Sequence, residues 1–275
     1  MSTSPEAAST VKDTVRAAIE ERSGAFVRLA HDIHAHPEPA FAEQYAAGRI
    51  TDTLADAGFD IRLAVFDLPT AFVARIGNGP LHIAFCAEHD ALDDGIGHGG
   101  GHHLTAGAAV AAATGLHGIV DEVGLMVSVI GTPGGADASA FDGVHAALTV
   151  HAGPSPCTEL ALLRNDPVLA AIYRRNAEAL GRTVAPDGES QDQIDQDGTD
   201  LDAVSHGISS IHPMIGIGGL APTNTVAFTA QADTDDAYRA MLDAAVALAW
   251  TALDAATDPA VRSHLLDRAR PRWSS

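Results

Sequence analysis

The chain has 275 residues, of which 46% are hydrophobic and 19% charged, a composition typical of a folded globular protein. Its formal net charge of −20 disfavours binding to nucleic acid and to anionic membranes. Because Lys12 is the only lysine, a Schiff-base, pyridoxal-phosphate or Walker lysine is not expected.

The N-terminal part of the chain predicts two helices followed by short strands. Residues 1–10 are expected to form a disordered lead, and apolar residues at helical spacing predict a helix over 11–32. A second helix is expected over 42–57, with Gly58 as its C-cap. Three short apolar or alternating segments separated by turn-forming residues predict strands. These are 61–66, 71–76 and 81–87.

Helices and strands alternate through the rest of the chain. An alanine-rich helix is expected over 102–118, and another over 167–181, with Asp166 as N-cap and Pro167 at its first position. The acidic segment 186–202 is expected to be a loop. Further strands are predicted over 125–130, 146–150, 211–217 and 225–232, and further helices over 235–256 and 259–268.

This order of elements predicts an α/β fold, a three-layer αβα sandwich. No internal repeat or linker divides the chain, so we expect a single domain over 11–275. No apolar run reaches the ~20 residues of a membrane span, the N-terminus is polar, and Cys86 and Cys157 form no disulfide framework. We therefore expect a cytoplasmic protein. In open α/β sheets ligands bind beyond the C-terminal ends of strands, so the loops after Ala87, Ile130 and Val150 are the expected place for chemistry.

Residues 88–103 concentrate four histidines and four carboxylates in a glycine-rich loop. Imidazoles and carboxylates are the ligands of zinc, and glycines allow a backbone to approach a ligand closely. His151 follows another predicted strand and could be a ligand, a base or a buried core histidine. Asp200 and His212 belong to a hydroxyl- and histidine-rich stretch that could line a pocket or form a plain loop.

Motifs in a fixed order resemble those of a known family. Residues 34–38, 88–92, 95–98, 131–133 and 210–213 read HAHPE, EHDAL, GIGH, GTP and SIHP. They are similar to motifs of the aminoacylase/carboxypeptidase-type zinc metallopeptidases, in the branch acting on N-acyl amino acids, auxin conjugates, p-aminobenzoyl-glutamate and dipeptides. The resemblance implies the catalytic domain of a zinc exopeptidase and hydrolysis of amide bonds.

The resemblance also implies a set of zinc ligands, and several of these positions differ. Members of the family hold paired zinc ions with a Cys or Asp, three His and a Glu, beside a general-base Glu. His102 and His151 match two of the ligand histidines. The bridging cysteine position holds Gly100, and the last histidine position holds Asn224. The two glutamate positions hold Gly135 and Ala136.

A second departure concerns the family's lid and dimerisation domain, which normally follows the His151 region. Here only residues 152–165 lie between His151 and the helix expected near Asp166. The resemblance therefore predicts a catalytic domain without its lid, and it leaves the oligomeric state open. Ordinary hydrolysis with two zinc ions is not expected, because two histidines alone make a weak zinc site.

The leading hypothesis is a repurposed, metal-free enzyme that performs acid–base chemistry on a small molecule, such as a condensation, cyclisation, dehydration, isomerisation or lyase step. Its acid–base residues would be His89, Asp90, His102, His103 and His151. Its substrate pocket would be lined by Glu88, His98, Asp200, His212 and Asn224.

Two other functions stay open. One is an amidohydrolase with a single rebuilt zinc site, whose ligands would be His102, His151 and Asp90, with Asp137 replacing the lost glutamates. The other is a non-catalytic module that binds a small metabolite or an active partner protein.

Overall fold

The computed structural model describes residues 5–133, 141–155, 165–183 and 207–268. Within these ranges, a central sheet has the strand order β1-β2-β4-β3-β5-β7, and a separate ribbon pairs β6 with β8. The strands are β1 (Asp60–Leu63), β2 (Phe72–Ile76), β3 (Leu81–Glu88), β4 (Leu125–Thr132), β5 (Ala146–Leu148), β6 (His151–Gly153), β7 (Ser209–Ile211) and β8 (Met214–Gly216).

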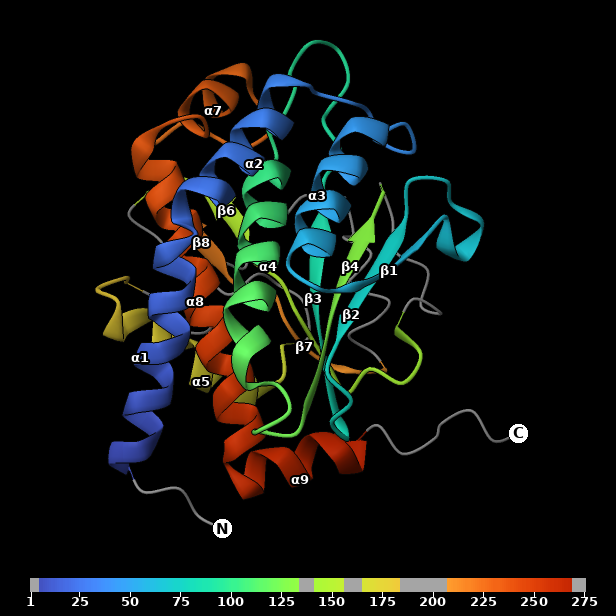
Figure 1. Ribbon diagram of the computed structural model, residues 1–275. Coiled ribbons are helices and arrows are strands. Elements are labelled where there is room, and N and C mark those ends of the chain that lie inside the picture. The colour runs from blue at the N-terminus through green and yellow to red at the C-terminus, as the bar shows by residue number, and fades with distance from the viewer. Residues whose placement is uncertain (1–4, 134–140, 156–164, 184–206, 269–275) are drawn as a thin grey trace.

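Helices flank this sheet, as Figure 1 shows for α1, α2, α4 and α8. The helices are α1 (Pro5–Glu21), α2 (Ser23–Ala35), α3 (Gln44–Asp56), α4 (His102–Leu116), α5 (Pro167–Ala179), α7 (Val226–Gln231), α8 (Asp235–Thr257) and α9 (Pro259–Arg268). Short 3₁₀ turns lie at Val65–Asp67 and His117–Ile119. The predicted α/β class is confirmed.

The middle of the sheet is parallel, and this direction places several loops together. β3 pairs in parallel with β4 and with β5, and β5 pairs in parallel with β7, whereas β1 and β2 are antiparallel additions at one edge. Glu88 at the end of β3 lies opposite Thr132 at the end of β4. The carboxyl ends of these strands therefore meet at one edge of the sheet, where an α/β fold binds ligands.

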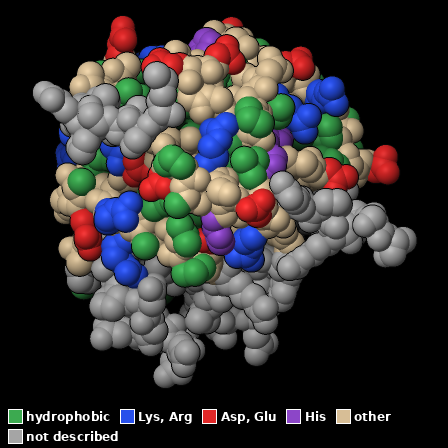
Figure 2. Space-filling view, turned by 90° about the horizontal axis from the view of Figure 1, so that it is seen from below, with side chains coloured by type: hydrophobic (Ala, Val, Ile, Leu, Met, Phe, Trp, Pro, Cys, Tyr) green, Lys and Arg blue, Asp and Glu red, His purple; other side chains and the backbone are tan. Residues whose placement is uncertain are grey.

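The main core lies between the sheet and α4, and it continues between α4 and α8. Apart from His102, every residue of α4 is buried, which explains why its alanine-rich sequence shows no polar face. The other face of the sheet carries a smaller cluster that includes Val73, Cys86, Ile130 and Phe141. On the face shown in Figure 2, acidic and basic side chains are interspersed in the coloured part and form no patch of a single sign.

Helix α8 is long and apolar enough to cross a membrane by length and composition alone. In the fold, 78% of its most apolar window is buried. The helix packs against α4 and α5, so its apolar character is that of a core helix.

Several segments differ from the prediction. Helix α1 begins at Pro5, inside the expected disordered lead, and the helix expected over 11–32 is two helices separated at Arg22. The strand expected over 211–217 is split, because β7 joins the large sheet and β8 pairs with β6.

The strand predicted over 225–232 is wrong, because this segment forms helix α7. Thr225 caps the helix, since its hydroxyl accepts a hydrogen bond from the Phe228 backbone N–H at 3.1 Å. The helix buries Phe228 and leaves Val226 62% exposed, although these two residues would share one face of a strand. A single cap and one buried ring therefore override the strand preference of its β-branched residues.

Candidate functional site

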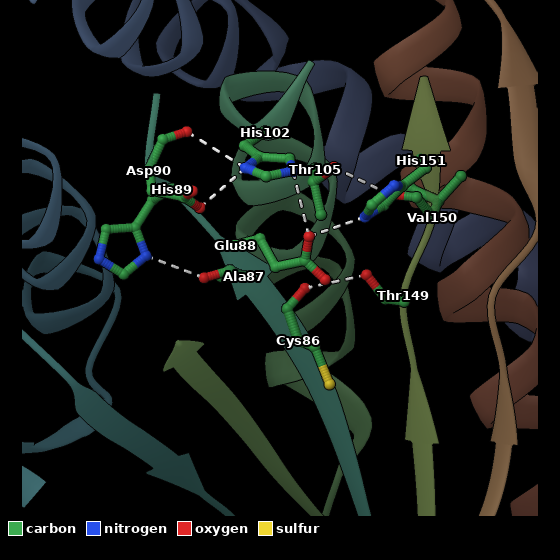
Figure 3. A network of polar contacts seen from close by, with 10 residues as sticks. All are labelled: Cys86, Ala87, Glu88, His89, Asp90, His102, Thr105, Thr149, Val150 and His151. Atoms are coloured by element: carbon green, nitrogen blue, oxygen red, sulfur yellow. Dashed lines mark hydrogen bonds and ion pairs between the residues drawn. The ribbon is translucent and has the colours of Figure 1, made fainter. Parts of the chain in front are cut away.

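Three side chains from three different elements converge at the carboxyl edge of the sheet. Glu88 is the last residue of β3, His102 the first of α4 and His151 the first of β6. Glu88 Oε2 lies 2.8 Å from His151 Nε2 and 3.3 Å from His102 Nε2. These ligand atoms all lie within 4.8 Å of one another, close enough to hold one metal ion (Figure 3).

Gly101 allows the start of α4 to lie close against β6. Gly101 has φ +75°, and a Cβ atom there would lie 2.7 Å from the Ala152 Cβ. A larger residue would both strain the backbone and push β6 away. One turn further along α4, the Thr105 hydroxyl donates to the Val150 carbonyl oxygen at 2.9 Å. These contacts bring the rings of His102 and His151 to a centroid distance of 5.5 Å.

Asp90 fixes the orientation of His102. Its Oδ1 atom lies 2.8 Å from His102 Nδ1, and its backbone carbonyl oxygen lies 3.2 Å away. Since both oxygens are acceptors, Nδ1 carries the proton, and a neutral His102 presents the lone pair of Nε2 to Glu88. A carboxylate behind a histidine that faces a metal is the usual outer partner of a metal ligand.

The arrangement creates an excess of acceptors that only a cation can relieve. The carboxylate oxygen of Glu88 and the Nε2 lone pair of neutral His102 face each other at 3.3 Å. Two lone pairs at this distance repel unless a proton or a metal ion lies between them. In the metal-free protein a proton fills this role. Burial disfavours a charged His102, but its hydrogen bond to Asp90 and the charge of Glu88 outweigh burial and raise the pKa of His102 to about 9.

The pKa values of the two carboxylates of the site are shifted downward, whereas that of His102 is raised. Burial alone would raise the pKa of Glu88, but the charge and hydrogen bond of His151 and the charge of His102 hold it well below its ordinary value. The pKa of Asp90 is also lowered, because its hydrogen bond with His102 outweighs its burial. Both groups are therefore carboxylates at neutral pH, the form that binds metal.

His212 is the third imidazole beside this group. Its ring packs edge to face against His151 with a centroid distance of 4.1 Å and an interplanar angle of 85°. Among the described residues, neither of its ring nitrogens has a hydrogen-bond partner. Burial and the nearby charge of His151 lower the pKa of His212 to about 3, so the ring is neutral.

Three other histidines named from the sequence do not join the site. His89 follows Glu88 but turns away from it, and its Nδ1 lies 3.0 Å from the Ala87 carbonyl oxygen (Figure 3). His98 and His103 pack with His34, at ring centroid distances of 6.1 Å and 4.8 Å from it. Burial lowers the pKa of His98 to about 4 and that of His103 well below its usual value, so these rings are neutral.

The remaining predicted residues lie around the start of α4 or beyond the described ranges. Asn224 donates its backbone N–H to the Gly99 carbonyl oxygen at 2.9 Å and has a φ of +62°. A Cβ atom on Gly100 would lie 3.1 Å from His102 Nε2, so the glycine leaves this nitrogen uncovered on that side. Asp137, Asp200 and the positions 135 and 136 lie outside the described residues.

The sequence assigned Glu88 to a substrate pocket rather than to a metal site, and the structure makes it the centre of the cluster. A signal was present, because Glu88 ends a run of seven buried residues in β3. The glutamate of the HAHPE segment and the one that follows it have structural roles. Glu38 accepts the backbone N–H groups of Tyr45 and Ala46 at the start of α3, and buried Glu43 accepts the Thr70 hydroxyl.

No protein-family model matches the chain. It is 33% identical to one of the subunits of the p-aminobenzoyl-glutamate hydrolase of Escherichia coli (strain K12), over 49% of this chain and 34% of that protein. It is 31% identical to the Xaa-Arg dipeptidase of Mus musculus, over 58% of this chain and 41% of that protein. The match to these two curated relatives spans only between 34% and 41% of their length.

Solved structures share the fold. The YXEP protein of Bacillus subtilis, a dinuclear metal-binding peptidase of the M20 family, matches with a TM-score of 0.69 and 16% identity, over 86% of this chain and 99% of that chain. The LapA aminopeptidase of Legionella pneumophila matches with a TM-score of 0.63 and 13% identity, over 90% of this chain and 74% of that chain. The fold is therefore that of M20 peptidase catalytic domains, and the homologues are peptidases and amidohydrolases.

Proposed function

We propose that this protein is a metal-dependent amidohydrolase with a single zinc ion held by Glu88, His102 and His151. The observation that carries the proposal is the convergence of one carboxylate oxygen and two imidazole nitrogens within 4.8 Å of one another. This favours the zinc alternative over the metal-free site that the sequence analysis preferred. The proposed ligand set differs from the one in the sequence analysis, because Glu88 replaces Asp90, which contacts His102 from the side away from Glu88.

The geometry of the three residues fits zinc. In a tetrahedral site with bonds of about 2.0–2.2 Å, neighbouring ligand atoms lie about 3.3 Å apart. The distance from Glu88 Oε2 to His102 Nε2 is 3.3 Å, and the distance to His151 Nε2 is 2.8 Å. An outward movement of His151 Nε2 by about 0.5 Å would bring its distance from Glu88 Oε2 to the tetrahedral value. Three protein ligands leave the fourth position open, as in catalytic rather than structural zinc sites.

Zinc at such a position supplies Lewis acidity, which polarises a carbonyl group and activates water. The residues of the chain prepare for that chemistry. Asp90 keeps one proton of His102 on Nδ1, so that Nε2 is the nitrogen that gives up its proton to bind zinc. Gly100 leaves the space over this nitrogen open to a substrate. The activities for which the relatives are named, hydrolysis of an aminobenzoyl-glutamate amide and of a dipeptide, support a small amide as the substrate class.

The proposal is tested by the zinc content of the purified protein. The protein is freed of metal with a chelator, dialysed against excess zinc, and analysed for bound metal per chain. We expect about one zinc per chain in wild type. Glu88→Gln removes the ligand charge with little change in shape, and Glu122→Gln is the matched control at an exposed position.

We expect zinc binding to be lost in Glu88→Gln and kept in Glu122→Gln. If wild type takes up no stoichiometric zinc, the metal site is refuted and the metal-free acid–base hypothesis stands in its place. If Glu88→Gln binds zinc as tightly as wild type, the ion is held elsewhere and the assignment of Glu88 is wrong.

A further inference from the structure

His212 is a buried polar side chain beside the site that has no partner among the described residues. The residue is 2% exposed, and neither ring nitrogen makes a hydrogen bond within that part of the chain. An unpaired buried donor or acceptor destabilises the fold, and such groups in native proteins need a specific reason. An aliphatic residue of similar size would fill the same space without this cost.

The backbone holds the His212 ring against one ligand of the proposed zinc site. The His212 N–H donates to Asn165 Oδ1 at 2.9 Å, and the next carbonyl, that of Pro213, accepts the His151 N–H at 2.9 Å. From the following residue onward, β8 pairs with β6 in parallel register. These two hydrogen bonds hold His212 beside the His151 ring.

The hydrogen bonds of His151 show that its ring would need an acceptor, which His212 could be, once Nε2 binds a metal. In the metal-free state, His151 Nε2 donates to Glu88 Oε2 at 2.8 Å. When Nε2 binds a metal, the ring proton must reside on Nδ1, and metal-bound histidines almost always donate this second N–H to an acceptor. His102 has Asp90 for this purpose. In the described part of the chain, no side chain or backbone group accepts a hydrogen bond from His151 Nδ1.

We propose that His212 is the positioning residue of His151, and that a small rotation of its ring lets one nitrogen accept the Nδ1–H of metal-bound His151. The inference rests on the zinc site proposed above. It explains why a neutral imidazole with a free lone pair is kept in a buried position. It also gives the two ligand histidines unlike partners, because His102 has a carboxylate behind it and His151 has a neutral ring.

The test measures zinc affinity by competition with a chromophoric chelator for wild type and three variants. His212→Phe keeps a ring but removes the acceptor, whereas His212→Asn and His212→Gln each keep an acceptor oxygen. Loss of an outer partner lowers metal affinity about 10- to 100-fold, which is the loss expected for His212→Phe. At least one amide variant should stay within about threefold of wild type. His145→Phe, at a half-buried histidine outside the site, should bind zinc like wild type.

A second measurement covers the case in which His212→Phe does not fold. In wild type labelled with ¹⁵N-histidine, zinc should move the His151 proton from Nε2 to Nδ1 and shift one His212 nitrogen to an acceptor resonance. The inference is overturned if His212→Phe binds zinc like wild type, if neither amide variant recovers binding, or if the His212 resonances do not respond to zinc. Failure of wild type itself to bind zinc would instead refute the proposed function.

Discussion

Two clusters that contain histidines lie close together in this protein, and they differ in the groups that the Nε2 atoms contact. The first group is Glu88, His102 and His151, in which imidazoles face a carboxylate. The second is His34, His98 and His103, in which each Nε2 lies about 3 Å from a backbone carbonyl oxygen, at 3.0 Å for His34 and 3.1 Å for the other two. At His98 and His103 burial outweighs these hydrogen bonds, lowers the pKa of both rings and keeps them neutral.

His102 and His103 make the contrast sharpest, because they are consecutive residues of α4. The carboxylates around His102 raise its pKa to about 9, whereas burial away from carboxylates lowers the pKa of His103 well below its usual value. The comparison indicates that the charged groups around a buried histidine, and not its position in the sequence, decide the direction in which its pKa is shifted. Substitutions in the two groups can break or sharpen this contrast.

The largest expected effect is a difference in zinc affinity between substitutions of His102 and of His103. His102→Asn removes a ligand, so zinc affinity should fall more than about 100-fold, beyond the loss typical of outer partners. His103→Gln removes a histidine whose ring faces away from the site, so affinity should change less than about threefold. Titration of each metal-free protein with zinc measures both. Equal losses in the two variants would contradict the separation of the groups.

The next effect concerns the carboxylate behind a ligand. Asp90→Asn weakens the acceptor at His102 Nδ1, and zinc affinity should fall about 10- to 100-fold. The control is Asp233→Asn, because Asp233 Oδ2 lies 3.7 Å from His34 Nδ1 in the second group. This variant should bind zinc like wild type. An unchanged affinity in Asp90→Asn would show that the orientation of His102 does not depend on Asp90.

The third prediction concerns Asp166, which pairs with a histidine but is not expected to bind zinc. Asp166 is 2% exposed, and it accepts hydrogen bonds from His264 and Ser209 and from the first turn of α5. Because all of these partners donate hydrogen bonds, the Asp166 carboxylate does not need a metal ion to balance facing acceptors. Asp166→Ala should destabilise the fold by about 2–3 kcal/mol through loss of an N-cap and buried hydrogen bonds, without changing zinc affinity. Denaturant unfolding and zinc titration measure the two quantities.

Asp166 also sets an expected dependence of stability on pH. Burial alone would raise its pKa, but hydrogen bonds from His264, Ser209 and the Leu169 backbone outweigh burial and lower it below the ordinary 3.8. A lowered pKa means that the unfolded chain binds the proton more readily than the native state. The stabilisation is therefore fully present above the ordinary pKa of 3.8 and is lost as the pH falls through the lowered value. The stability difference between wild type and Asp166→Ala should shrink over this acidic range, and a constant difference would contradict it.

The smallest expected effect is a gain of affinity. A Cβ atom at Gly100 would lie 3.1 Å from His102 Nε2, and Gly100 does not require a positive φ. Gly100→Cys should therefore offer a thiolate to a metal at the site and tighten zinc binding several-fold, with Gly100→Ser as control. The cobalt form of Gly100→Cys should gain a thiolate-to-metal absorption band. Its absence would place the metal away from His102.

The sequence predicted the elements that bring the site together, because each has a strong local signal. Buried apolar runs mark β3 and β4, an alanine-rich run marks α4, and Asp166 caps α5 as expected. The short strands near His212 were harder to predict, because the division between two sheets depends on long-range pairing.

For the site, the sequence named the residues but could not say which of them meet. Successive residues of a strand point to opposite faces, so Glu88 and His89 diverge where β3 ends. Successive residues of a helix differ by about 100° in direction, which separates His102 from His103. Composition shows that histidines and carboxylates are near one another, whereas their directions depend on where the strand ends and the helix begins.

The most direct test of the central claim is a crystal structure of the protein soaked with zinc, with anomalous diffraction recorded on both sides of the zinc edge. We predict one anomalous peak, bonded to Glu88 Oε2, His102 Nε2 and His151 Nε2. A site without a peak there, or a peak among His34, His98 and His103 instead, would contradict the claim that carboxylate partners decide where the cation binds.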